Sequence, residues 1–229
     1  CYTSSCNYTF GIYKEKKLSS FGLMNKDEVQ YYLTNKLKFS HDDLEKLTLF
    51  HEELIKFNTK YNLISRSTVT DIWNRHILDS AQVVKFIRFE DNKSLSDMGS
   101  GAGFPGLILS IFNKNNKFHV KLHEKSNIKC DFLRIIREKL NLNYDILGDY
   151  KFDLIDSDYV VSRAFKKLEE VLRISREIIG VNHKLIILKG KNAENEINKL
   201  HQPLSFIYNL ERSVTDRDSK ILIVDIKKN

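Results

Sequence analysis

The residues best suited to hold a ligand lie in the run SDMGSGAGFPG, where four glycines fall within eight positions. Without side chains, Gly99, Gly101, Gly103 and Gly106 let the backbone approach a bound molecule closely. An apolar run follows the last glycine and is expected to form a helix, whose first turn offers free N–H groups and positive potential. The spacing therefore predicts a strand, a glycine-rich turn and a helix that together hold a nucleotide-like molecule.

Two binding templates fit this loop, and they imply different chemistry. Residues 101–106 match G-x-G-x-x-G, the dinucleotide fingerprint, and residues 97–103 match D-x-G-x-G-x-G, the loop of S-adenosylmethionine-dependent methyltransferases. Asp97 can face the ammonium group of a methyl donor, or a water bound to it, but it would repel the pyrophosphate of a nicotinamide cofactor. This carboxylate favours S-adenosylmethionine as the cofactor. The alternative for Asp97 is an ordinary helix-capping or turn residue.

Two further residues suit a cofactor loop. Pro105 fits the first turn of the following helix, where no N–H donor is needed. Glu124 ends the next apolar run, 25 positions after Gly99, and an acidic residue there can accept both ribose hydroxyl protons. The alternative for Glu124 is a solvated charge at the end of a strand.

Hydrophobic periodicity predicts the elements that position the loop. Between Lys26 and Ile87 the pattern is helical, and Ser40 is a suitable N-cap for the longest helix. Apolar residues three and four apart form one face of that helix: Leu44, Leu47, Phe50, Leu54, Phe57 and Tyr61. The stretch RHILDSAQVVKFI predicts a further helix, with one apolar face made by Ile77, Leu78, Ala81, Val84 and Ile87.

From Ser94 onward, short apolar runs alternate with longer amphipathic ones. The runs SLSDM, FHVKLHE, YDILG, DYVVSR and HKLIILKG are typical of strands, and helical patterns separate most of them. This alternation predicts an α/β fold with a doubly wound, mostly parallel sheet. The last two expected strands, PLSFIYNLER and SKILIVDIKK, follow each other with only a short charged turn between them. This predicts an antiparallel strand pair at a sheet edge.

The change of pattern at Ser94 also suggests how the chain is divided. We interpret residues 24–93 as a helical N-terminal part and residues 94–229 as the domain that holds the cofactor. Residues 1–23 precede the first methionine, Met24, and have no continuous apolar region of the kind found in secretory signals. We interpret them as an extraneous or disordered extension.

Composition limits the class of partner. The formal charge is +7 and the pI is about 9.1, which favours a polyanion such as nucleic acid. No apolar run reaches the roughly 18 residues of a membrane-spanning helix, so we expect a cytoplasmic protein with no membrane partner. Cys1, Cys6 and Cys130 lack the spacing of metal ligands, so no metal is expected, and Cys130 is expected to be buried on a helix.

Four motifs in order give the sequence a family resemblance: YNLISRSTVTDIWNRHILDS, SDMGSGAGFPGL, VVSRAF and ILKG. Together they resemble the bacterial guanine-N7 methyltransferases of small-subunit ribosomal RNA, the glucose-inhibited division protein B family. The resemblance covers residue 25 to the C-terminus. It implies a seven-strand methyltransferase sheet with a helical N-terminal part, S-adenosylmethionine as the donor, and a guanine N7 in a loop of 16S rRNA, within the small ribosomal subunit, as the acceptor.

The resemblance also implies roles for single residues. Gly99 and Phe104 would contact the donor from the loop, and Glu124 stands where the family usually has Asp. Arg163, in VVSRAF, would lie at the site after the fourth strand. The residues of the RHILDS motif would sit near the cofactor or the RNA: Arg75, His76, Asp79 and Ser80.

The sequence departs from the family pattern in two segments. After the second strand, EKSNIKC keeps Lys129 but has Lys125 where Ser is usual and Ile128 where a second basic residue is common. Before the fourth strand, GDYKFDLIDSDY lacks the expected hydrophobic–glutamate pair. The adenine-side contact is therefore placed near Asp149 and Tyr150.

The implied chemistry needs no strong base, because guanine N7 carries an in-plane lone pair while the base is neutral. Catalysis would depend mostly on positioning, with hydrogen-bond donors to guanine O6 stabilising the developing charge. Arg163 and Arg75 are candidates for orienting RNA or donor. Asp79 could hold Arg75, four positions away on the same helix face, or the two could form a purely structural ion pair. His76 completes the catalytic candidates, although a packed or hydrogen-bonded histidine is favoured over a base.

Access to N7 restricts the form of the substrate. In an RNA duplex N7 lies in a deep groove, so the target guanine should lie in a loop or be flipped out. Phe104 and Phe165 could stack on it, or each could belong to the core. Four lysines flank the carboxyl ends of expected strands, where they could bind phosphates or form a solvated rim: Lys166, Lys167, Lys189 and Lys191. Phosphate contacts would make RNA affinity fall steeply with salt.

Three other functions remain open on the sequence alone. The G-x-G-x-x-G run and Glu124 would also suit an NAD-dependent oxidoreductase. A methyltransferase could act on another RNA or on a small molecule, and a non-catalytic RNA-binding module of ribosome assembly would bind RNA without binding the donor. We expect a monomer with no DNA partner.

Overall fold

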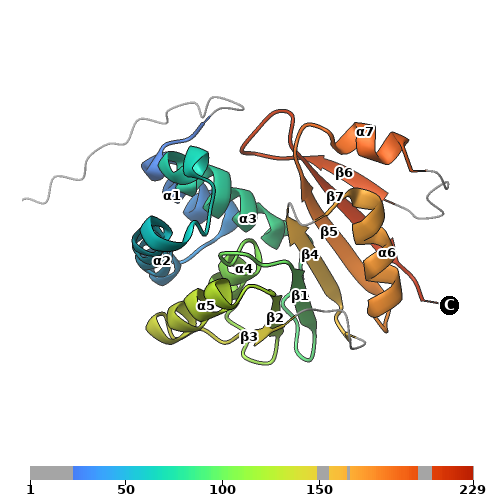
Figure 1. The fold of residues 1–229 in the computed structure, drawn as a ribbon, viewed down its shortest axis with the longest axis horizontal. Coiled ribbons are helices and arrows are strands. Elements are labelled where there is room, and N and C mark those ends of the chain that lie inside the picture. The colour runs from blue at the N-terminus through green and yellow to red at the C-terminus, as the bar shows by residue number, and fades with distance from the viewer. Residues whose placement is uncertain (1–22, 149–154, 164–165, 201–207, 229) are drawn as a thin grey trace, which may run out of the picture.

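A seven-strand sheet is the central element of the computed structural model, which describes residues 23–148, 155–163, 166–200 and 208–228 (Figure 1). The strands are β1 (Ser94–Met98), β2 (His119–His123), β3 (Asp145–Leu147), β4 (Tyr159–Arg163), β5 (His183–Lys189), β6 (Tyr208–Arg212) and β7 (Lys220–Ile226). Their order is β3-β2-β1-β4-β5-β7-β6. The pairs among β1 to β5 are parallel, and β7 is antiparallel to both β5 and β6. The predicted mostly parallel sheet with an antiparallel edge is confirmed.

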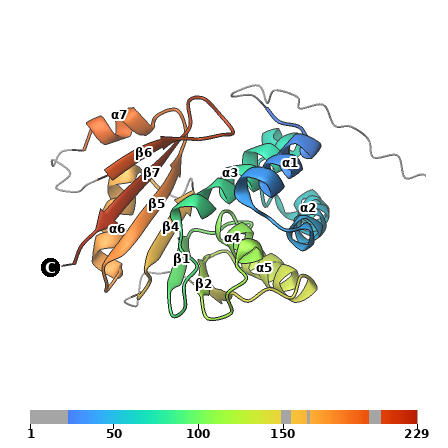
Figure 2. The same cartoon turned by 180° about the vertical axis from the view of Figure 1, so that it is seen from behind.

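Helices cover both faces of this sheet, as the views from opposite sides show (Figures 1 and 2). On one face lie α1 (Lys26–Leu37), α2 (His41–Tyr61), α4 (Gly106–Phe112) and α5 (Asn127–Lys139), and on the other lie α6 (Leu168–Ile178) and α7 (Ala193–Asn198). Each face has its own cluster of buried apolar side chains. Cys130 is buried on α5, as predicted. None of the helices within the described ranges is long and apolar enough to cross a membrane.

The segment between α2 and the sheet is helical but irregular. It consists of η1 (Arg66–Asp71), η2 (Trp73–Leu78), α3 (Asp79–Ala81) and η3 (Gln82–Phe86), and η2 is a π-helical turn. The backbone N–H of Asp79 accordingly donates to the carbonyl of Asn74, five residues earlier. The predicted apolar face of this segment is buried. The prediction of a regular helix is wrong, because the segment is divided into π, α and 3-10 helical turns.

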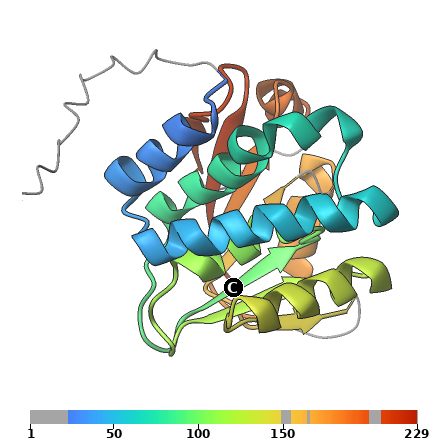
Figure 3. The same cartoon turned by 90° about the vertical axis from the view of Figure 1, so that its left-hand side faces the viewer.

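Helix α2 crosses in front of the sheet and packs on α4 and α5 (Figure 3). Ser40 is its N-cap, as predicted, and forms a capping box with Asp43. Leu47 and Leu54 on its predicted apolar face are fully buried. Tyr61 is not, because α2 ends at this residue and the chain turns away at Asn62, where φ is 41°.

Phe50 joins α2 to the elements beneath it. Its side chain is fully buried. Its ring meets the ring of Phe104 edge-on, with centroids 5.4 Å apart, and lies 6.2 Å from the ring of Phe132 on α5. This one side chain therefore connects α2 to the glycine loop and to α5.

Replacing Phe50 with alanine is expected to lower the free energy of unfolding by about 3–5 kcal/mol, because it removes buried apolar surface and leaves a cavity. Denaturant unfolding measures the loss, with the denaturant dependence unchanged. Leu49 is the matched control, since it is the preceding residue of the same helix and is 50% exposed. Leu49→Ala should change the same quantity by less than about 0.5 kcal/mol, and equal losses in the two variants would contradict the role given to Phe50.

Candidate functional site

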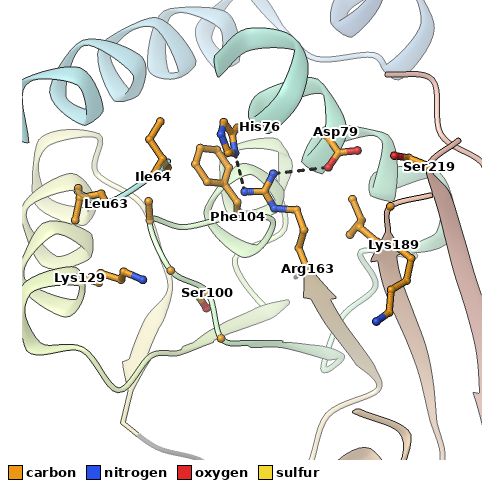
Figure 4. A pocket seen from close by; sticks show the side chains of 15 residues that line it. Leu63, Ile64, His76, Asp79, Ser100, Phe104, Lys129, Arg163, Lys189 and Ser219 are labelled. Atoms are coloured by element: carbon orange, nitrogen blue, oxygen red, sulfur yellow. Dashed lines mark hydrogen bonds and ion pairs between the residues drawn. The ribbon is translucent and has the colours of Figure 1, made fainter. Parts of the chain in front are cut away.

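A cavity of about 430 Å³ opens at the carboxyl ends of β1, β4 and β5 (Figure 4). Its wall includes Gly99 and Gly101 of the glycine loop, Arg163 at the end of β4, and Ile64 and His76 of the helical segment. Ligands of open α/β sheets bind at this edge, and the volume lies within the range of small-molecule sites. The cavity therefore lies where the sequence places the cofactor loop.

Positive φ angles shape the loop. They are 78° at Gly99, 58° at Gly101 and 101° at Gly103, a region that side chains other than glycine rarely adopt. The N–H groups of Gly99 and Ser100 both donate to the carbonyl of His123 at 3.0 Å, which ties the loop to β2. The result is a fixed, side-chain-free cradle beside the cavity.

Glu124 holds this cradle through hydrogen bonds to both of its carboxylate oxygens. One carboxylate oxygen accepts a hydrogen bond from the N–H of Gly101 at 2.9 Å, and the other accepts one from the N–H of Ser126 at 2.8 Å. Glu124 is buried, so the alternative of a solvated strand-end charge is wrong. Each oxygen keeps a further lone pair for a ribose hydroxyl.

Asp97 lies beneath the loop rather than in the cavity wall. It is fully buried, and its Oδ2 accepts a hydrogen bond from the N–H of Gly106 at 2.8 Å, at the start of α4. This contact supports the helix-capping alternative for Asp97. Pro105 occupies the N-cap position of α4, one residue before the expected first turn. The Oδ1 of Asp97 has no hydrogen-bond partner among the described residues, and burial raises the pKa of this carboxyl to about 7.

Asp97 is expected to make stability depend on pH. The folded protein keeps the proton up to about pH 7, whereas the unfolded chain releases it near pH 4. In this window the folded state binds more protons, so its stability falls as pH rises. The free energy of unfolding of the wild type relative to Asp97→Asn should therefore decrease by a few kcal/mol between about pH 4 and about pH 7. Denaturant titrations at several pH values measure this difference, and a constant difference would contradict the raised pKa.

Arg163 is held in place by the RHILDS motif (Figure 4). One terminal nitrogen donates to the backbone carbonyl of Arg75 at 3.2 Å, and the other donates to Nδ1 of His76 at 2.9 Å. The carboxylate of Asp79 lies 3.7 Å from the guanidinium, which also lies 4.7 Å from the centre of the Phe104 ring. The structure thus brings three of the four catalytic candidates into contact through their side chains.

The ring of His76 has both nitrogens engaged. Because a guanidinium only donates, Nδ1 must accept from Arg163, so the ring proton lies on Nε2, which is 2.8 Å from Oγ1 of Thr68. Burial lowers the pKa of His76 to about 3, and the positive charge of Arg163 contributes to this shift. A neutral, doubly hydrogen-bonded ring supports the packed role over that of a base.

The predicted pairing of Arg75 with Asp79 is wrong. Asp79 pairs with Arg163 instead, and its Oδ1 also accepts hydrogen bonds from Gln82 at 3.0 Å and from Thr215 at 3.1 Å. The side chain of Arg75 is exposed and has no carboxylate partner among the residues that the structure describes. The π-helical turn explains the difference, because it aligns residues five apart rather than four. Burial raises the pKa of Asp79, and the charge of Arg163 opposes that shift.

Phe104 lines the cavity, but it is not available to stack on a base. It is only 3% exposed. The ring of His76 stacks on it with centroids 5.0 Å apart, and Phe50 meets its edge. Three other residues named from the sequence lie outside the described residues: Asp149, Tyr150 and Phe165.

The lysines of the strand ends divide into two groups. The ammonium group of Lys189 is 2.8 Å from Glu196 and donates to the carbonyl of Lys166, while Lys166 itself pairs with Glu170. Lys167 and Lys191 are exposed. The expectation that the lysines at the strand ends bind phosphates therefore rests on Lys167 and Lys191.

Some residues of the cavity wall were not predicted. Leu63 and Ile64 come from the YNLISRS run, whose place in the family motif was a usable signal. Ser219 comes from the turn before β7, and nothing in the sequence pattern pointed to it. Lys129, kept from the family pattern, extends its ammonium group toward the cavity (Figure 4).

Comparison with known proteins agrees with this geometry. A family model named GidB, rRNA small subunit methyltransferase G, matches residues 43–221. Ribosomal RNA small subunit methyltransferase G of Pelagibacter ubique is 35% identical over 86% of this chain and 96% of its own length. The protein of the same name from Rickettsia felis is 38% identical over 79% of this chain and 92% of its own.

Solved structures with low sequence identity share the fold. A SAM-dependent methyltransferase from Aquifex aeolicus superposes with a TM-score of 0.51 at 16% identity, over 75% of this chain and 96% of that chain. A mutant of MtNAS in complex with S-adenosylmethionine gives a TM-score of 0.55 at 12% identity, over 90% and 85%. The sheet, the glycine loop and the match over most of the chain lead to one assignment: the protein belongs to the GidB family, rRNA small subunit methyltransferase G.

Proposed function

We propose that the protein transfers a methyl group from S-adenosylmethionine to N7 of a guanine in a loop of 16S rRNA. The observation that carries the proposal is the placement of Arg163 beside the glycine cradle, where His76 and Asp79 hold it at the cavity. The relatives named ribosomal RNA small subunit methyltransferase G support the substrate class.

The residues present fit the donor. The cradle lets the backbone at Gly99 and Gly101 approach an adenosine-like group, and Glu124 retains lone pairs for its ribose hydroxyls. When bound, S-adenosylmethionine supplies an electrophilic methyl group on a sulfonium. We assign the donor site to Asp97, Gly99, Gly101, Gly103, Phe104, Glu124, Arg163, Asp149 and Tyr150. Of these, Asp97 would act through the loop it supports.

The chain's own residues then position the guanine rather than deprotonate it. N7 attacks through its lone pair, and His76 is neutral with both nitrogens engaged, so no base takes part. Arg163 has more N–H groups than its present contacts use, and these can donate to guanine O6 as positive charge develops on the purine. His76 and Asp79 are positioning residues for Arg163. The exposed side chain of Arg75 is placed to contact the RNA backbone.

The proposal extends to the partner and to the organisation of the chain. The substrate is 16S rRNA, free or within the small ribosomal subunit, which places the reaction in the cytoplasm. The protein acts as a monomer without DNA, and residues 24–93 form a helical part that completes the cavity of the methyltransferase domain, residues 94–229.

The test incubates the protein with radiolabelled S-adenosylmethionine and either undermethylated 30S subunits or naked 16S rRNA, and then maps the label. Label at guanine N7 is the expected result, and its absence there would overturn the proposal. Label in another RNA would instead indicate a methyltransferase with a different target. RNA binding without donor binding, even at millimolar donor, would indicate a non-catalytic assembly module.

A further inference from the structure

An exposed tyrosine ends helix α2 two residues before the chain enters the cavity wall. Tyr61 is the last residue of α2 and is 47% exposed, and Leu63, two residues later, already lines the cavity. The backbone N–H of Ile64 donates to Oδ1 of Asn58 at 2.9 Å, which fixes the turn from the helix into the cavity wall. This hydrogen bond fixes the backbone on both sides of Tyr61 and so keeps Tyr61 close to the cavity wall.

The ring of Tyr61 rests on other aromatic rings. Its centroid is 6.1 Å from that of Phe57, one helical turn earlier, and Phe57 is 5.2 Å from Phe132 of α5, which packs on Phe50 in the core. The ring of Tyr61 is thus held by Phe57, although the residue remains about half exposed. A ring held in this way loses little side-chain entropy when a second flat group stacks on it.

Exposed cations lie near Tyr61 along the chain and before α5. Lys60 and Arg66 flank Tyr61 along the chain and are exposed, as is Lys125 just before α5. Helices α2 and α5 pack antiparallel, since Phe57 meets Phe132 and Glu53 pairs with Lys139. Continuing that alignment brings Tyr61 to the first turn of α5, where Ile128 is exposed and Lys129 faces the cavity.

These four cations form no ion pairs with the described part of the chain. In the described part of the chain, none of Lys60, Arg66, Lys125 and Lys129 lies within ion-pair distance of a carboxylate. A flat aromatic face among free cations suits an unpaired nucleotide, whose base stacks and whose phosphates bind the positive charges. Phe104, the aromatic residue in the cavity wall, is covered and leaves this task open.

We propose that Tyr61 is a stacking platform for an unpaired RNA base next to the target guanine, and that Lys60, Arg66, Lys125 and Lys129 contact the adjoining phosphates. This inference rests on the proposed function, because it assumes that RNA enters the cavity. Tyr61 thus acts in substrate binding and not in the transfer of the methyl group.

The experiment compares Tyr61→Ala with Tyr61→Phe, which keeps the ring. The measurements are the Kd for naked 16S rRNA by filter binding, the Kd for S-adenosylmethionine by calorimetry, and the KM and kcat of methylation. Tyr61→Ala should raise the RNA Kd and KM about tenfold, with the donor Kd and the kcat at saturating RNA unchanged. Tyr61→Phe should bind as the wild type does.

Two exposed tyrosines provide matched controls. Tyr31 on α1 is 53% exposed and Tyr208 on β6 is 44% exposed, and their alanine variants should leave RNA affinity unchanged. Lys125→Gln should reduce the slope of log affinity against log salt by about one. An RNA Kd for Tyr61→Ala that equals that of the wild type or of Tyr31→Ala would overturn the proposal.

The outcomes separate this proposal from the proposed function. Methylation of guanine N7 with no effect of Tyr61→Ala would refute only the stacking platform. RNA binding that depends on Tyr61, without any label at N7, would refute only the proposed reaction. An effect confined to assembled 30S subunits and absent with naked RNA would indicate a ribosomal protein at this surface and would also overturn the stacking proposal.

Discussion

Replacing Arg163 with alanine is expected to lower the kcat of methyl transfer by at least about 100-fold. This is the usual cost of losing a preorganised hydrogen-bond donor that stabilises charge developing in the transition state. The structure supports this size of effect because Arg163 is fixed by the carbonyl of Arg75, by His76 and by Asp79 before any substrate binds. Because the guanidinium of Arg163 is already oriented as a hydrogen-bond donor, it needs no reorganisation during the reaction. Single-turnover kinetics at saturating donor and RNA measure the loss.

The same substitution also leaves Asp79 mostly buried without its cation, which should cost stability as well. Arg163→Lys keeps a positive charge beside Asp79 but cannot make the forked contacts with His76 and Arg75. It should melt close to the wild type and still lose most of the turnover. The double variant Arg163→Ala with Asp79→Asn removes the unpaired charge and should recover stability without recovering kcat. Turnover near that of the wild type in the folded Arg163→Lys variant would reassign Arg163 to structure.

Substituting aspartate for Gly99 is expected to abolish measurable binding of S-adenosylmethionine. Gly99 follows β1 directly, has a φ of 78° and lines the cavity, so any side chain occupies space where the backbone must approach the ligand. The new side chain would also add a negative charge to the loop that Glu124 already contacts through the N–H of Gly101, which adds like-charge repulsion. Calorimetric titration with the donor measures the loss.

Gly99→Asn separates space from charge, since it has the same size as the aspartate without its charge, and asparagine tolerates a positive φ better than most residues. Both variants should lose donor binding if close backbone approach is the cause, while their melting temperatures show whether the loop still folds. Wild-type affinity in Gly99→Asn would show that the cradle does not need glycine at this position.

Local sequence signals were sufficient for most of the fold. The alternation of apolar runs after Ser94 predicted the strands and a mostly parallel sheet, because hydrophobic periodicity is set within each element. The glycine loop was likewise predictable, since a positive φ at three alternate positions selects glycine regardless of what packs nearby. Ser40 was identified as an N-cap for the same reason: its side chain accepts a hydrogen bond from the N–H of Asp43, only three residues later.

The partners of the site residues were not predictable in this way. Spacing along a regular helix paired Asp79 with Arg75, but a π-helical turn shifts the alignment and Asp79 meets Arg163 instead. Its further partner Thr215 lies 136 residues away in sequence. Tyr61 continued the apolar pattern of α2, yet it is exposed because the helix ends beside the cavity. In each case the outcome depends on where another element lies.

The sequence by itself predicted the glycine cradle at a strand end, and it contained the family motifs that accompany this cradle. These features follow from backbone conformation and from contacts that close within one element. Only the tertiary structure decided which side chain holds Arg163, that His76 stays neutral, that Asp97 supports α4, and that Phe104 is covered while Tyr61 is free. Burial and long-range pairing control those properties, and both arise only when distant segments pack together.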